Sequence, residues 1–235
     1  MGLDVYAGSL TRYLAGDWEL VTQKAARELG VQLEVVRKHQ PEDAIRDPDA
    51  IRPVVQHWRD SLSEALREKL SSPLDWDEAS GAPYFTDKPT WDCYAALMLW
   101  AAYDEQRHLS RPFDGPAEWS DDPAYKASTA TGFYSRYSQL YDVAMWLPCD
   151  FHFVFQADFI TGSEMLIGSS IELSRQLDVL NQRTWTANVP TLDQWRFDGA
   201  EKGATLETSA RFAFSIFKTL ADQSTDHHLP MLLDW

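Results

Sequence analysis

The sequence predicts one mixed domain of the α/β or α+β class, spanning residues 1–235, rich in helix and built around a small sheet. Short segments in which apolar and polar residues alternate predict strands, and longer segments with apolar residues three and four apart predict helices. An almost unbroken apolar run over residues 91–102 predicts a helix that is buried on all sides. No repeat, low-complexity tract or Gly/Ser linker divides the chain, which favours one continuous core.

The first third of the chain opens with a predicted strand over 3–8, where Leu3 and Val5 alternate with polar neighbours. Asp17 is expected to cap a helix that ends before Gly30, and alternation over 31–36 predicts a second strand. This order is typical of a βαβ unit or a split version of it. Asp47-Pro48 then predicts the start of a helix to Ser71, interrupted at Pro53.

The middle third contains the predicted central helix, over 89–106, flanked by two loops rich in Asp, Gly and Pro. The first loop, 72–88, is interpreted as a loop or a short edge strand. The second loop, 108–122, leads into helical segments expected between 123 and 146.

The last third begins with a predicted hairpin whose strands cover 150–157 and 164–168, joined by a turn at Thr161-Gly162. Ser169 and Glu172 form a capping-box pattern, which predicts a helix that follows the hairpin. A short helix and a long final helix are then expected, beginning near 191 and 206.

The charge of the chain is its most unusual property. Twenty-one Lys and Arg residues stand against 36 Asp and Glu residues, for a net charge of −15. Because such a surface repels phosphate backbones, nucleic acid is not an expected partner. Residues 72–122 contain eleven acids and three bases, which indicates either a solubilising face or a docking face for a basic protein. On the docking hypothesis the contact residues are Asp75, Trp76, Asp77, Glu78 and Trp91.

Compartment is predicted from what the sequence lacks. The N-terminal residues have no basic and apolar regions typical of a signal peptide, and no apolar stretch approaches the roughly 20 residues that span a bilayer. Cys93 and Cys149 lie in apolar surroundings and are expected to be reduced and unpaired. We therefore expect a cytoplasmic protein with no membrane partner.

Four segments of the sequence are distinctive: the opening Met-Gly-Leu-Asp-Val-Tyr, the turn Gly-Asp-Trp-Glu at 16–19, the stretch Tyr-Phe-Thr-Asp-Lys-Pro at 84–89 and the closing residues 229–235. Together they resemble a group of uncharacterised bacterial proteins. The resemblance implies a bacterial, cytoplasmic origin. It implies no activity and no site residues.

Side chains that could take part in catalysis are spread along the sequence. Asp150 and His152 share one face of a predicted strand while Cys149 lies on the other face, so a Cys–His pair is not expected. Asp150, His152 and Asp4 form the candidate catalytic set if the protein is an enzyme of the hydrolase type. No cofactor is expected, because the sequence lacks a phosphate-binding glycine loop.

No metal site is expected either. The six histidines show no HExxH spacing, and Cys-x-x-Cys does not occur. Asp226, His227 and His228 could together ligate a metal, but adjacent histidines point in different directions and a helix-end role is the favoured interpretation of them.

Two functions follow from these observations. The favoured one is an acidic binding protein, such as an immunity protein or an antitoxin-type inhibitor of a basic protein, supported by the charge and by ten tryptophans. The alternative is a hydrolase-type enzyme whose site is assembled from Asp4, Asp150 and His152.

Overall fold

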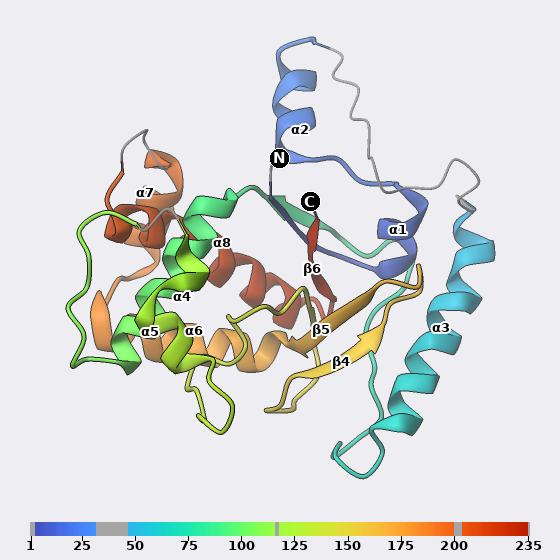
Figure 1. The fold of residues 1–235 in the computed structure, drawn as a ribbon. Coiled ribbons are helices and arrows are strands. Elements are labelled where there is room, and N and C mark those ends of the chain that lie inside the picture. The colour runs from blue at the N-terminus through green and yellow to red at the C-terminus, as the bar shows by residue number, and fades with distance from the viewer. Residues whose placement is uncertain (1–2, 32–46, 116–117, 200–203, 235) are drawn as a thin grey trace.

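The two terminal strands of the chain lie side by side in the middle of a six-stranded sheet (Figure 1). The computed structural model describes residues 3–31, 47–115, 118–199 and 204–234. The strand order is β2-β1-β6-β3-β5-β4. The strands are β1 (Asp4–Ala7), β2 (Phe85–Asp87), β3 (Met145–Leu147), β4 (Phe155–Asp158), β5 (Glu164–Ser169) and β6 (Met231–Asp234).

The pairing of these strands is mostly antiparallel. Only β3 and β5 run parallel, with Met145 opposite Ile167, and β4 and β5 form the expected hairpin. Because the strands are not built from repeated βαβ units, the fold is of the α+β class, within the classes predicted from the sequence.

Helices cover both faces of the sheet (Figure 1). Side chains of β1 alternate between two hydrophobic clusters: Val5 and Ala7 pack with α4, α6 and α8, whereas Tyr6 packs with α1 and α3. The helices are α1 (Leu10–Ala15), α2 (Val21–Glu28), α3 (Pro48–Ala65), α4 (Trp91–Glu105), α5 (Pro123–Ser128), α6 (Ser170–Thr184), α7 (Val189–Asp198) and α8 (Leu206–Asp226).

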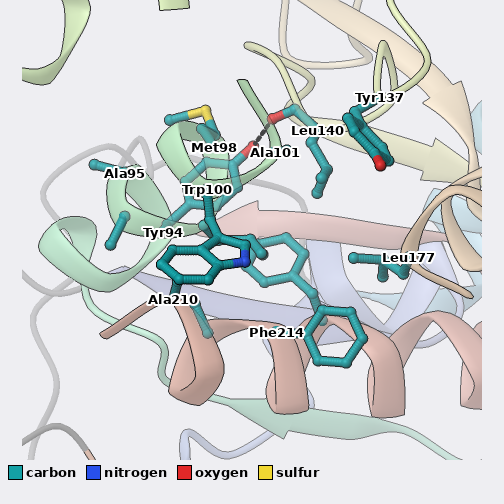
Figure 2. Packing of buried hydrophobic residues seen from close by; sticks show 14 of the residues in the cluster. Tyr94, Ala95, Met98, Trp100, Ala101, Tyr137, Leu140, Leu177, Ala210 and Phe214 are labelled. Atoms are coloured by element: carbon teal, nitrogen blue, oxygen red, sulfur yellow. Dashed lines mark hydrogen bonds between the residues drawn. The ribbon is translucent and has the colours of Figure 1, made fainter. Parts of the chain in front are cut away.

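Helix α4 is the buried helix that the apolar run predicts. Residues 93–104 are all buried, and Leu97 is 0% exposed. Figure 2 shows its side chains packed against α8, where the Tyr94 ring stacks on Phe217 with 4.8 Å between ring centroids. The Tyr94 hydroxyl donates a 2.9 Å hydrogen bond to the Leu140 carbonyl, so this buried polar group is satisfied.

Several predicted helix starts are confirmed. Asp47 accepts from the Asp49 amide at the start of α3, and Ser169 accepts from the Glu172 amide at the start of α6. Each side-chain oxygen satisfies a backbone donor that the helix leaves free.

Other predictions are wrong in detail. Asp17 is not a helix cap, because Gly16 in the left-handed region ends α1 and α2 begins only at Val21. Pro53 lies inside α3 without ending it. The helix is held by burial of Ile51, Val55 and Leu62, but it stops at Ala65 rather than at Ser71.

Two central strands do not follow the sequence prediction. Met145 and Trp146 were expected at the end of a helical segment but belong to β3, and the chain end after Pro230 forms β6. The predicted strand at 150–157 is paired only from Phe155 onward. The predicted strand at 31–36 lies outside the described residues, apart from Val31. Among the residues that the structure does describe, no helix is long and apolar enough to cross a membrane.

Candidate functional site

The two predicted contact residues Trp76 and Glu78 are buried in the domain. Trp76 is 3% exposed and donates from Nε1 to Glu78 Oε1 over 2.6 Å. The Glu78 carboxylate also accepts from the amides of Leu10 and Thr11, at 2.9 and 2.8 Å, which are the first donors of α1. Glu78 therefore anchors a helix N-terminus, and neither side chain is available to a partner.

The other three predicted contact residues do not form a common face with them. Asp75 is exposed and lies 3.0 Å from Arg59, while Asp77 accepts from the Ala79 amide in a local turn. Trp91 is partly buried at the start of α4, with its ring 6.4 Å from that of Tyr94.

The acidic segment is also less exposed than its composition suggests. Asp87, Asp104 and Asp122 are all buried, at 8%, 3% and 7% exposure. Asp87 pairs with Arg196 of α7, and Asp122 caps α5 and accepts from the Tyr103 hydroxyl. Much of the acidic segment therefore serves the interior.

The structure does not bring together the candidate hydrolase residues. Asp4 lies at the first position of β1, opposite Asp234 and 3.3 Å from the Lys88 ammonium. Asp150 and His152 follow the far end of β3, on the surface, where they contact Arg175 and Glu172. Since β1 and β3 both run antiparallel to β6, Asp4 and Asp150 lie toward opposite ends of the sheet.

Histidine and cysteine side chains are the groups that could supply metal ligands or a nucleophile. Within the described ranges, no group of three His, Cys, Asp or Glu side chains is arranged to hold a metal ion. Cys93 and Cys149 are free thiols. Burial raises the pKa of both thiols, that of Cys149 to about 11, so neither is an activated nucleophile.

An open pocket lies instead where α4 ends, α6 ends and α8 begins. Its volume is about 460 Å³. The wall combines aromatic, cationic and acidic side chains: Trp100, Tyr103, Asp104, Arg107, Arg111, Arg183, Thr184, Trp185 and Glu207. We call this the α4 pocket.

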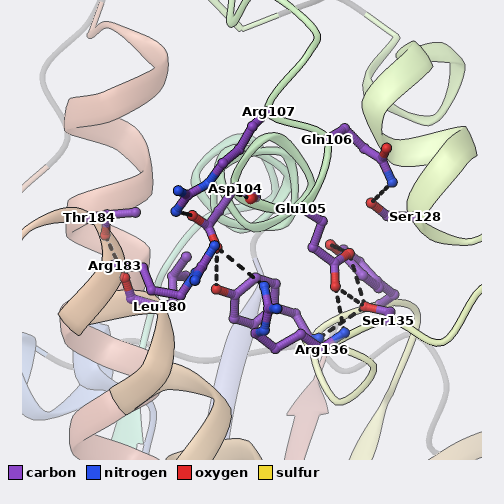
Figure 3. Close-up of polar contacts among 12 residues, drawn as sticks. Asp104, Glu105, Gln106, Arg107, Ser128, Ser135, Arg136, Leu180, Arg183 and Thr184 are labelled. Atoms are coloured by element: carbon purple, nitrogen blue, oxygen red, sulfur yellow. Dashed lines mark hydrogen bonds and ion pairs between the residues drawn. The ribbon is translucent and has the colours of Figure 1, made fainter.

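Asp104, in the last turn of α4, is the hub of the pocket (Figure 3). Its carboxylate accepts from Arg107 at 2.7 Å, from Arg183 Nε at 2.5 Å and from the Tyr137 hydroxyl at 2.6 Å. Burial alone raises the pKa of Asp104, but the hydrogen bonds from Arg183, Tyr137 and Arg107 outweigh it and hold the pKa below its ordinary value. The carboxylate is therefore ionised, and both of its oxygens accept hydrogen bonds.

Glu207, in the first turn of α8, is committed in the same way. It accepts from Trp185 Nε1 at 3.2 Å and forms an ion pair with Arg211. Both carboxylates of the pocket wall are thus neutralised by the protein itself.

Arg111 differs from every other arginine of the pocket. Its guanidinium carbon lies 3.6 Å from the centre of a Trp100 ring, a close cation–π contact. In the part of the chain that the structure describes, no carboxylate lies within ion-pair distance of Arg111. Partial burial lowers the pKa of Arg111, the direction expected for a cation removed from water.

The local charge of the pocket is opposite to that of the chain. Arg107, Arg111 and Arg183 line it, and Arg136 and Arg211 contact its two carboxylates, Arg136 at 3.9 Å from Asp104. Five guanidinium groups thus meet two carboxylates in a protein of net charge −15. The arrangement can accept an anion.

Comparison of the chain with protein-family models, with curated protein sequences and with solved structures finds no match in any of the three.

The sequence alone does not reveal this pocket, because its lining residues come from three separate segments. One signal was present: Asp104, Arg107 and Arg111 recur at intervals of three and four directly after the apolar run. That spacing places charged residues at one end of a buried helix.

Proposed function

We propose that this protein is a binding protein that captures an anionic ligand group in the α4 pocket. The observation that carries the proposal is Arg111, a guanidinium held against Trp100 at the pocket wall, with no described carboxylate within ion-pair distance of it. Every other pocket arginine already contacts Asp104 or Glu207.

The chemistry of the pair supports an anion. Guanidinium groups present several N–H donors in one plane and match the oxygens of carboxylate or phosphate groups. Trp100 is 5% exposed and fixed in the core, so it fixes the plane of the Arg111 side chain before a ligand arrives.

Binding is favoured over turnover by the state of the pocket hydroxyls. Tyr103 donates to Asp122 at 2.9 Å and Thr184 donates to the Leu180 carbonyl at 2.7 Å. Burial, followed by the hydrogen bond to Asp122, raises the pKa of Tyr103 to about 12, which keeps this hydroxyl protonated. Neither group is poised as a nucleophile or a base.

The proposal is tested by thermal denaturation with phosphate, sulfate and acetate at constant ionic strength. Wild-type protein should gain stability with at least one anion, since a ligand that binds only the folded state raises its melting temperature. Arg111→Gln should lose this response. Arg59→Gln is the matched control, because Arg59 also lies over a tryptophan, Trp76, but is paired with Asp75. An equal response in wild type and Arg111→Gln contradicts the proposal.

A second candidate is the inhibitor of a basic protein, of the immunity or antitoxin type, supported by the net charge of −15. With Trp76 and Glu78 buried, its contact residues would be acids that remain exposed, such as Asp92, Asp114 and Glu118. Reversal of these three charges should slow association with a basic partner recovered from the host. An unchanged association rate contradicts this candidate.

A further inference from the structure

We infer that the ligand of the α4 pocket is a small phosphate monoester rather than a carboxylate or a nucleic acid. This inference rests on the proposed anion-binding function and specifies its ligand.

The balance of donors and acceptors points to phosphate. Asp104 already accepts three hydrogen bonds, and Arg183 reaches it through Nε alone. Among the described residues, no hydrogen bond engages a nitrogen of Arg111, whereas Arg183 also interacts with the Tyr137 hydroxyl. A phosphate monoester carries three terminal oxygens and a charge near −2 at neutral pH, whereas a carboxylate offers two oxygens and one charge. The open donors therefore match the larger anion.

The organic part of the ligand follows from the rest of the pocket. A volume of about 460 Å³ exceeds the needs of an inorganic ion and falls within the range of small-molecule sites. The exposed wall of the pocket is mostly polar, because Trp100 and Tyr103 are only 5% exposed and Trp100 already contacts Arg111 and the stacked ring of Trp185. The remaining space suits a compact organic substituent on the phosphate.

The charge of the whole chain restricts the size of the ligand. A nucleic acid would bring many phosphates against a surface of net charge −15, whereas the arginines of this pocket can hold only one of them. A ligand with a single phosphate avoids that repulsion.

The test is titration calorimetry with three probes that share one ring: phenyl phosphate, phenyl sulfate and benzoate. We expect phenyl phosphate to bind at least tenfold more tightly than the other two, and more tightly than inorganic phosphate. Arg111→Gln should weaken phenyl phosphate at least tenfold, and Arg111→Lys should weaken it less because it keeps the charge. Arg59→Gln should bind like wild type.

The results distinguish the phosphate inference from the proposed anion-binding function. If benzoate or phenyl sulfate binds as tightly as phenyl phosphate, and does so through Arg111, the phosphate inference is overturned while the anion-binding function stands. If none of the probes binds at millimolar concentration to folded wild-type protein, both are overturned. Equal binding of phenyl phosphate by wild type and Arg111→Gln also overturns both.

Discussion

The carboxylate of Glu78 fixes the start of α1 from a loop 68 residues further along the chain. It joins Leu10, Thr11 and Trp76 in one buried cluster, with all three donors within 2.9 Å. A residue that composition places on an acidic surface thus acts inside the domain. The reason is that a carboxylate can satisfy several helix N–H groups at once, which no apolar side chain can do.

Replacement of this carboxylate should be costly. Glu78→Ala leaves three buried donors without an acceptor, and we expect it to lower the free energy of unfolding by about 3 kcal/mol or more. The neighbouring Asp77→Ala removes one local turn contact and should cost below about 1 kcal/mol. Urea denaturation of both variants measures the difference. Similar small losses would show that Glu78 is a surface residue.

The lowered pKa of Asp104 makes the stability of the protein depend on pH. Because its folded-state pKa is lowered, its contribution to stability is present above the ordinary pKa of 3.8 and is lost as pH falls through the lower folded value. Asp104→Asn should therefore cost about 3 kcal/mol at pH 7, where two arginines and Tyr137 lose an ionised partner. The difference in free energy of unfolding between wild type and Asp104→Asn should narrow between pH 4 and pH 2.

The matched control for Asp104 is Asp75→Asn, an exposed carboxylate paired with one arginine. Exposed pairs contribute little, so its unfolding should resemble wild type across the same pH range. A gap between wild type and Asp104→Asn that stays constant down to pH 2 would contradict the ionised-hub account.

At the scale of elements, helix α4 decides how the domain is built. Leu97 is 0% exposed within the cluster formed with α6 and α8, so Leu97→Ala should leave a cavity and cost about 2–5 kcal/mol. Val54→Ala on α3 removes an apolar side chain that is 45% exposed and should change stability by less than about 0.5 kcal/mol. Chemical denaturation compares them. A loss below about 1 kcal/mol for Leu97→Ala would mean that α4 is peripheral.

The elements also show where sequence patterns carry information and where they do not. The apolar run of α4, the alternation in β1 and the cap at Ser169 are local signals, and each predicted its element. Strands β3 and β6 are short and almost wholly buried, so apolar residues fill both faces and no alternation marks them. Their assignment requires knowledge of their neighbours in the sheet.

The candidate site follows the same rule. Burial of Trp76, Asp104 and Glu78 depends on partners from distant segments, and the sequence gives composition without those partners. Composition therefore indicated an acidic face, whereas the fold uses Glu78 and Asp104 to anchor α1 and the pocket arginines.

At the scale of the whole molecule, the sheet depends on the last strand of the chain. Strand β6 lies between β1 and β3, and the Trp18 ring packs 4.9 Å from the ring of Tyr6 in β1.

Removal of residues 231–235 should therefore prevent folding, because it separates β2-β1 from β3-β5-β4 and uncovers buried residues on both faces. Near-ultraviolet circular dichroism of the truncated and complete chains measures this. A truncated chain with native spectra and cooperative unfolding would contradict the sheet order.

The proposed contact between Arg111 and the phosphoryl group of a small ligand is tested most directly by a crystal structure of the protein saturated with phenyl phosphate. We predict phosphoryl oxygens within hydrogen-bonding distance of the Arg111 guanidinium, with Trp100 still beneath it and Asp104 still bound to Arg107 and Arg183. A phosphoryl group bound elsewhere, or an α4 pocket left empty at saturation, would contradict the account.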